Sequence, residues 1–185
     1  MRRLATLLTA GLVIVSACSG GGLSVDEYSS AVETQAAANA DEITALADHN
    51  ISELEVAVAR LQREVEEDEL AEAVIAETAM LTSKLFAGMG DALDRYVQDL
   101  EVLDAPSDLE TDHRAYIVAL DASRSGIAPL LADLAAAVTF DDIDRAIGSS
   151  GFSDAQPRVV AACISLEGGI EALGPVVDLR CEPNG

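Results

Sequence analysis

Tryptophan is absent from this 185-residue chain, and aromatic residues make up only 3% of it. A surface that stacks on bases is therefore not expected, since such surfaces are built from aromatic rings. Basic residues are also few: 11 Lys and Arg stand against 33 Asp and Glu, which gives a net charge of −22. This balance argues against a nucleic-acid partner, because affinity for phosphate comes largely from basic side chains. Hydrophobic residues make up 50% of the chain, which favours a folded core over disorder.

The beginning of the chain has the features of an export signal. Arg2 and Arg3 are followed by an uncharged apolar run over residues 4–15. A run of about a dozen residues is too short to cross a hydrocarbon core of about 30 Å, so it predicts a cleaved signal peptide. The next residues, Val15-Ser16-Ala17-Cys18, resemble the lipobox of bacterial lipoproteins. This resemblance implies cleavage before Cys18 and the attachment of acyl chains such as palmitate to it.

The predicted organisation follows from that signal. Residues 1–17 are expected to be removed, residues 18–24 to form a lipidated cysteine with a flexible tether, and residues 25–185 to form one domain. Because two acyl chains hold a protein stably at a bilayer, Cys18 would anchor the domain at the extracytoplasmic face of the cell membrane. The alternative is an ordinary signal peptide whose cleavage leaves Cys18 as a free thiol.

The remaining cysteines, Cys163 and Cys181, predict a disulfide, because an exported domain meets oxidising conditions. One continuous helix would hold them about 27 Å apart, whereas a disulfide needs Cα atoms within about 7 Å. The chain must therefore turn back, and Gly174-Pro175 supplies a helix stop. We expect the tail to return along the last helix; a redox role would favour more closely spaced cysteines.

The body of the chain predicts long helices, since alanine is abundant and apolar residues recur at intervals of three and four. The expected segments are residues 25–63 with an apolar stripe that includes Ile51, 70–104, 107–138 with a kink or restart near Gly126, a short helix at 141–147, and 154–173. Residues 64–69 form an acidic turn. The fold class is therefore all-α: an antiparallel bundle of about four long helices with a disulfide-pinned tail.

Four positions predict where helices begin. Ser24 and Thr139 are expected caps, and Ser107 with Glu110 has the spacing of a capping box. Ser52 with Glu55 has the same spacing, so the first helix either breaks near residue 50 or continues through it.

The candidate metal ligands are Glu110 and His113, which match the E-x-x-H half-motif of di-metal helical bundles. His49, the other histidine, lacks a glutamate three residues earlier and is expected to be exposed beside Glu53. His113 lies on an apolar stripe, so an interior structural histidine is the alternative. The sequence has no hydrolase, phosphate-loop or dinucleotide-binding motif, and no cofactor is predicted.

The second half of the chain is similar to uncharacterised helical lipoproteins of high-GC Gram-positive bacteria. The shared features are Ala105-Pro106, His113 with Tyr116, the stretch from Cys163 to Leu166, and the stretch from Val177 to Cys181. This resemblance implies a bundle and a disulfide but no activity. We therefore predict a non-enzymatic envelope protein that binds an unknown envelope protein or ligand through a strongly acidic surface. The alternative is a carrier of a metal ion or small ligand in the bundle interior, with Tyr116 also facing inward.

Overall fold

The computed structural model describes residues 23–181, and within that range it contains helices and no strands. The helices are α1 (Val25–Glu64), α2 (Leu70–Glu101), α3 (Glu110–Ser125), α4 (Ile127–Ala135), α5 (Phe140–Gly148) and α6 (Gly151–Ala172). The predicted all-α bundle with a disulfide-pinned tail is confirmed. The signal peptide, Cys18 and most of the tether lie outside the described residues. None of the helices from residue 23 to residue 181 combines the length and apolar character needed to cross a membrane.

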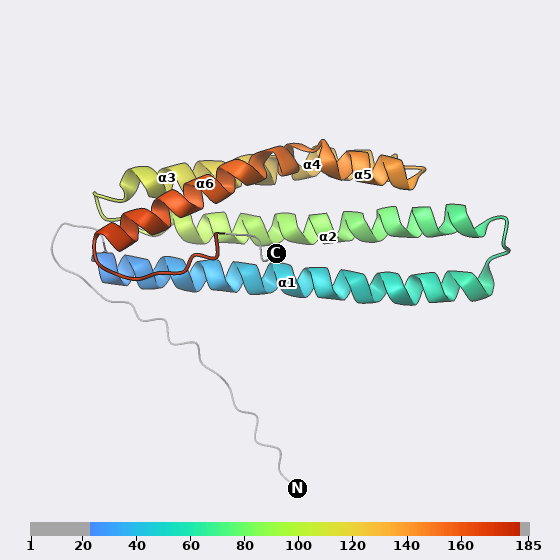
Figure 1. The fold of residues 1–185 in the computed structure, drawn as a ribbon, viewed down its shortest axis with the longest axis horizontal. Helices are drawn as coiled ribbons and strands as arrows, with labels where there is room; N and C mark the ends of the chain where they lie inside the picture. Colours follow the sequence, from blue (N-terminus) through green and yellow to red (C-terminus); the bar gives the residue numbers. More distant parts are fainter. Residues whose placement is uncertain (1–22, 182–185) are drawn as a thin grey trace, which may run out of the picture.

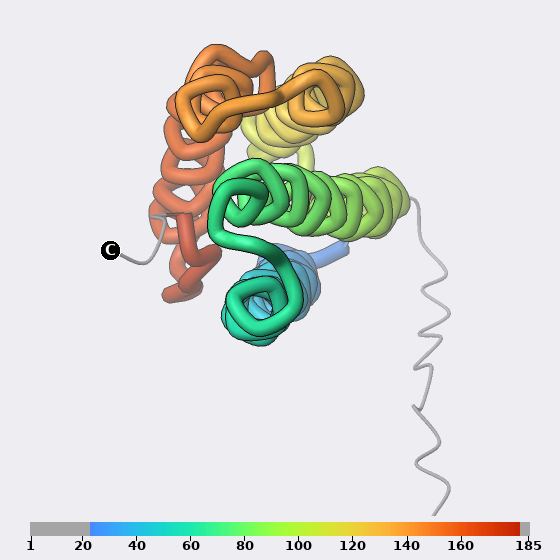
Figure 2. Tube along the Cα trace, turned by 90° about the vertical axis from the view of Figure 1, so that its right-hand side faces the viewer, coloured from blue at the N-terminus to red at the C-terminus, as the bar shows by residue number. Residues whose placement is uncertain are grey.

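The two longest helices, α1 and α2, form an antiparallel hairpin, over which the shorter helices form a second layer (Figure 1). Viewed along the hairpin, α2 lies between α1 and the layer formed by α3, α4 and α5, while α6 lies to one side (Figure 2). The main contacts pair α1 with α2 and α3 with α6, and α2 also packs against α3 and α4. Helix α2 is therefore the central element of the bundle.

Helix α1 begins at the predicted cap and is continuous. The Ser24 hydroxyl accepts a hydrogen bond from the backbone N–H of Glu27, and the Glu27 carboxylate accepts one from the N–H of Ser24. The helix then runs through residue 50 without a break, so the capping role considered for Ser52 is wrong. Asn50 explains part of this continuity, because its side-chain amide donates to the Leu81 carbonyl of α2 at 2.7 Å. Packing against α2 outweighs the weak local helix propensity.

The apolar stripe predicted for α1 is wrong at Ile51, whose exposed fraction is 58%. Only one helix, α2, packs extensively against α1, so a narrow face of α1 is covered. The buried residues lie mainly near the start of α1, where Tyr28, Val32 and Ala36 face the core.

The capping box predicted at Ser107 is also wrong. Helix α3 begins at Glu110, and no side chain caps it. The N–H of Leu109 instead donates to the Pro106 carbonyl at 2.8 Å, which forms a turn that buries Leu109. Glu110, freed from a capping role, accepts a hydrogen bond from Arg114 at 2.5 Å.

A break at Gly126 separates α3 from α4, as predicted, and it lies against the start of α6. A Cβ atom on Gly126 would lie 2.0 Å from the backbone nitrogen of Phe152. Thr139 caps α5 as predicted, since its hydroxyl accepts from the N–H of Asp142. Val138, the last residue of the helical segment expected over residues 107–138, is 75% exposed because the chain leaves α4 before reaching it.

Helix α6 begins three residues earlier than predicted, at Gly151, with Ser150 as its cap. Pro157 lies inside the helix, beyond its opening turn. The core that these helices enclose includes large, fully buried side chains: Tyr28, Leu100, Leu109, Leu130, Leu134, Leu166 and Ile170.

Candidate binding cavity between α1 and α6

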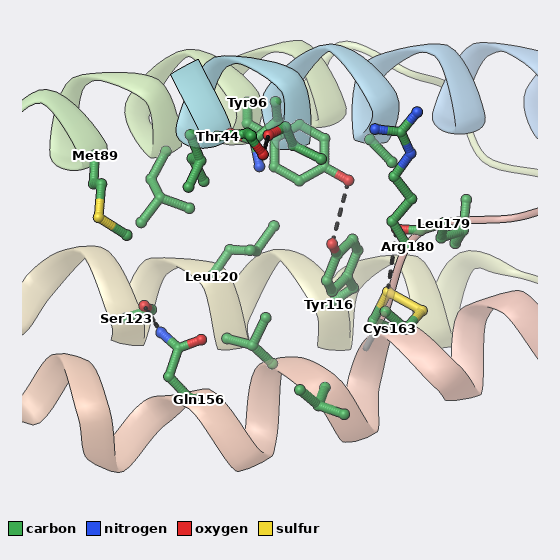
Figure 3. A pocket seen from close by; sticks show the side chains of 18 of the residues that line it. Thr44, Met89, Tyr96, Tyr116, Leu120, Ser123, Gln156, Cys163, Leu179 and Arg180 are labelled. Carbon is green, nitrogen blue, oxygen red and sulfur yellow. Dashed lines mark hydrogen bonds between the residues drawn. A yellow bond between two sulfur atoms is a disulfide. The ribbon is translucent and has the colours of Figure 1, made fainter. Parts of the chain in front are cut away.

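A cavity of about 610 Å³ lies between α1 and α6, over a floor formed by α2 and α3 (Figure 3). The residues that line the cavity are mostly apolar. Those contributed by α1 include several with small side chains: Ala36, Ala40 and Ala47. Alanine occupies too little volume to fill the space between the helices at these positions. The cavity is thus a consequence of the alanine-rich face of α1. Its volume lies within the range of about 300–1,000 Å³ that is typical of small-molecule sites.

Two tyrosines form the polar part of the floor. The hydroxyls of Tyr96 on α2 and Tyr116 on α3 lie 3.2 Å apart, and their rings meet edge to face (Figure 3). Burial raises the pKa of both phenols, so both remain protonated at neutral pH. Each hydroxyl therefore keeps its hydrogen for donation.

Amide side chains from opposite walls add further polar groups. The Gln156 amide of α6 donates to the Ser123 hydroxyl at 3.0 Å, as Figure 3 shows. On α1, the side-chain oxygen of Asn39 is buried and accepts no hydrogen bond from the described residues. Buried polar atoms of this kind are uncommon in native proteins, since each costs free energy unless a partner satisfies it.

The C-terminal tail closes one end of the cavity. Leu179, Arg180 and Cys181 line it, and the predicted disulfide between Cys163 and Cys181 is present, with Cα atoms 5.4 Å apart. The tail turns back along α6 as expected, because the N–H of Leu179 donates to the Glu167 carboxylate at 2.9 Å.

The same tail also binds α1. Arg180 donates to the Asp41 carboxylate at 2.7 Å, and the N–H of Asp178 donates to Glu33 at 3.4 Å. Arg180 has a φ of +53°, a left-handed conformation that costs a non-glycine residue about 1–2 kcal/mol. The disulfide and these hydrogen bonds hold the tail in that conformation, bridging α1 and α6.

Charge at the cavity is sparse. Asp48 and Arg180 are the charged residues that line it, and both are exposed. Arg180 is already paired with Asp41. Among residues 23–181, the cavity wall therefore offers no unpaired cation to an anionic ligand.

The candidate metal residues have different environments. Glu110 is exposed and pairs with Arg114, whereas His113 is buried and its Nδ1 lies 2.7 Å from the Tyr28 hydroxyl. Burial lowers the pKa of His113, although a hydrogen bond with the Leu100 backbone opposes this effect. Residues 23–181 contain no group of three or more histidine, cysteine or acidic side chains placed to hold a metal ion. His49 is exposed and lies 3.6 Å from Glu53, as the sequence suggested.

Sequence reasoning anticipated Tyr116 as an inward-facing residue but missed the other polar groups of the cavity. The available signal was Asn39, a polar residue set among the apolar residues Ala36, Ala40 and Ile43 at helical spacing. Tyr96, Gln156 and Arg180 had no pattern that indicated a site.

A second hollow, also of about 610 Å³, lies between α2 and α4. Its polar side chains are already engaged: Ser83 donates to the Ala79 carbonyl, and Lys84 lies 3.9 Å from Glu53. This hollow presents no buried polar atom that lacks a partner among the described residues.

Comparison with protein-family models, with curated proteins and with solved structures finds no match to this chain.

Proposed function

We propose that this protein is a non-enzymatic, lipid-anchored protein of the cell envelope that binds a small, largely apolar ligand in the cavity between α1 and α6. The observation that carries the proposal is the cavity of about 610 Å³, with apolar walls and a few inward-facing polar groups. This combination is typical of small-molecule sites. The anchor is inferred from the lipobox-like residues that end at Cys18.

The composition of the cavity supports binding rather than catalysis. A general acid or base is most effective when its pKa lies near the working pH. The tyrosines have raised pKa values and stay protonated, and both lining cysteines are held in the disulfide. No histidine lines the cavity. The side chains present are suited to holding a ligand and not to transferring a proton.

Native mass spectrometry of residues 19–185, produced in an oxidising compartment, tests this proposal. That segment contains every helix and the disulfide of the described structure. We expect a bound mass that disappears when the same sample is denatured. The variant Ala40→Phe, which places a ring in the cavity, should lose the bound mass, whereas Ala59→Phe on an exposed part of α1 should retain it. A bound mass that persists in Ala40→Phe would place the ligand elsewhere.

The acidic surface supports a second candidate, in which the protein docks a cationic partner. Glu66, Glu67, Asp68 and Glu69 are all exposed in the turn between α1 and α2. Neutralising all four residues to Gln or Asn should weaken salt-sensitive binding of a polylysine peptide. It should leave the bound mass in the cavity unchanged, which separates the two candidates.

The alternative that the protein carries a metal ion receives less support, because Glu110 is exposed and paired with Arg114, whereas His113 is buried against Tyr28. Its test is metal analysis of His113→Ala beside His49→Ala. Metal retained in the second variant and lost in the first would favour this branch.

A further inference from the structure

The residues that line the cavity between α1 and α6 describe its shape. On α1 they extend from Ala36 to Asp48, and on α6 they extend from Phe152 to Cys163. At about 1.5 Å per residue, these stretches are about 18 Å and about 17 Å long. A volume of about 610 Å³ spread over that length corresponds to a mean width of about 6 Å. The cavity is therefore about three times as long as it is wide.

This width admits one hydrocarbon chain. Carbon atoms of neighbouring chains lie about 4 Å apart, so two chains side by side need about 8 Å and one chain needs about 4 Å. C–C bonds of about 1.5 Å advance an extended chain by about 1.3 Å per carbon, so a length of about 18 Å holds about fourteen carbons. The larger aliphatic side chains in the lining suit such a chain: Ile43, Met89, Leu93, Leu120, Val159 and Val160.

The two ends of the cavity differ in burial. At the tail, where Arg180 binds Asp41 of α1, the lining residues Tyr96, Tyr116 and Leu179 are at most 5% exposed. Figure 3 shows Cys163 and Arg180 at this end and Met89 at the other.

At the end away from the tail, Thr44 and Asp48 are exposed, and Met89 and Phe152 are only half-buried. A bound amphiphile would therefore keep its polar head in water at this second end, with its hydrocarbon terminus toward the tail.

The polar groups at the buried end favour the same direction of insertion. Arg180 is already paired with Asp41, so an ionised group inserted there would have no counter-ion among the lining residues. The hydroxyls of Tyr96 and Tyr116 are hydrogen-bonded to each other. Burying a charged head at this end would cost free energy, whereas burying a hydrocarbon terminus is favourable.

We propose that the cavity binds a single-chain amphiphile, with one unbranched hydrocarbon chain of up to about fourteen carbons lying along α1 and α6 and its end directed toward the tail. This inference rests on the proposed function and adds the chemical class and the orientation of the ligand.

The experiment uses residues 19–185 and the neutral fluorophore N-phenyl-1-naphthylamine as a probe of the cavity. The probe is displaced with unbranched 1-alkanols of eight to fourteen carbons. We expect each added carbon to tighten binding by about threefold to fourfold, because each buries one more CH₂ group. The branched isomer of 1-dodecanol, 2-butyl-1-octanol, has the same composition but two chains side by side. It should bind at least about tenfold more weakly than 1-dodecanol, since its second chain stays outside.

Two leucine substitutions on α1 test the direction of insertion. Ala40 and Ala47 both line the cavity, are both half-buried and lie two helical turns apart. Ala40 adjoins Asp41, the partner of Arg180, so Ala40→Leu fills space at the tail. The step from 1-decanol to 1-dodecanol, about tenfold in the unaltered protein, should fall below about twofold because the added carbons are no longer buried. Ala47→Leu lies at the exposed end, so it should keep this step and change the affinity for every alcohol by a common factor.

The outcomes separate this inference from the function on which it rests. If the probe binds but 2-butyl-1-octanol competes as well as 1-dodecanol, or Ala47→Leu and not Ala40→Leu shortens the accepted chain, this inference is wrong and the binding function stands. If neither the probe nor 1-dodecanol binds, both are wrong. Circular dichroism confirms that each variant is folded, and the two isomers decide the result on the unaltered protein where Ala40→Leu is not.

Discussion

The hydroxyl of Tyr28 lies 2.7 Å from Nδ1 of His113, joining the start of α1 to the start of α3 across 85 positions of the chain. Both side chains are buried, with exposed fractions of 0% and 7%. The rings meet edge to face at a centroid distance of 5.6 Å. The hydrogen bond between the His113 ring and the Leu100 backbone uses a ring N–H, because a backbone carbonyl can only accept. A neutral imidazole has a single N–H, so Nδ1 accepts from the Tyr28 hydroxyl. His113 therefore acts as a structural acceptor in this network.

This network makes stability depend on pH. Burial lowers the pKa of His113 in the folded state below its ordinary value of about 6.5, so the unfolded chain binds the proton more readily. The stabilising contribution is complete above about pH 6.5 and is lost as the pH falls toward the lower folded-state pKa. We expect urea denaturation to show a falling free energy of unfolding between about pH 7 and pH 5, before most carboxylates titrate. His113→Gln should remove this decline and His49→Gln should retain it; a decline that both variants keep would assign it to other groups.

Removing the tyrosine hydroxyl should destabilise the fold. Tyr28→Phe leaves a buried imidazole nitrogen without its donor, which costs about 1–3 kcal/mol. Tyr96→Phe should cost less, because Tyr116 lines a cavity with room for a water molecule that can replace the lost partner. Urea denaturation at pH 7.5 compares the two variants, and an equal loss would contradict the structural role assigned to Tyr28.

Loss of the disulfide should affect both stability and binding. Replacing Cys163 and Cys181 with serine removes a constraint that typically contributes about 3 kcal/mol for a loop of this size. Because the tail supplies one end of the cavity, the affinity of the cavity for a neutral fluorescent probe, N-phenyl-1-naphthylamine, should fall as well. Wild-type protein treated with reductant should behave like the double variant, which itself should not respond to reductant. Full probe affinity after reduction would show that the tail does not shape the site.

Replacing a glycine with alanine should have opposite effects on stability at two positions, Gly126 at the junction of α3 and α4 and Gly168 in α6. Gly126→Ala would place a Cβ atom 2.0 Å from the Phe152 nitrogen and 2.3 Å from the Gly151 carbonyl carbon. Backbone atoms of α6 cannot move aside cheaply, so a loss of about 3 kcal/mol is expected. Gly168→Ala, within α6 and facing open space, should stabilise the protein by up to about 1 kcal/mol. Thermal melts of the two variants test the pair, and a tolerated Gly126→Ala would mean that α6 lies farther from Gly126.

The sequence predicted the helices better than their beginnings. Ser24 and Thr139 were correct caps, whereas Ser52 and Ser107 have similar local patterns and cap nothing. A local pattern permits a helix to start but does not require it. At Ser52, contact with α2 continues the helix, and after Ser107 the burial of Leu109 sets the first turn.

The cavity was less predictable, because its volume depends on the spacing between helices and not only on their residues. The alanines of α1 predict close packing as readily as they predict a hollow. The hollow exists because α1 packs against α2, while the tail and not α6 covers this part of α1. That arrangement is tertiary, and Asn39 was its one local indication.

The tail lies at the end of the chain, so it completes the cavity only after the helices have been synthesised. Residues 179–181 follow all six described helices, so one end of the cavity stays open until α6 has been synthesised. Its closure then depends on the joining of Cys163 to Cys181, a reaction favoured in oxidising compartments and suppressed where thiols are kept reduced. The helices can assemble before that reaction, but the finished shape of the cavity cannot. A ligand met early finds that end of the cavity open, and one met after oxidation finds the tail lining it.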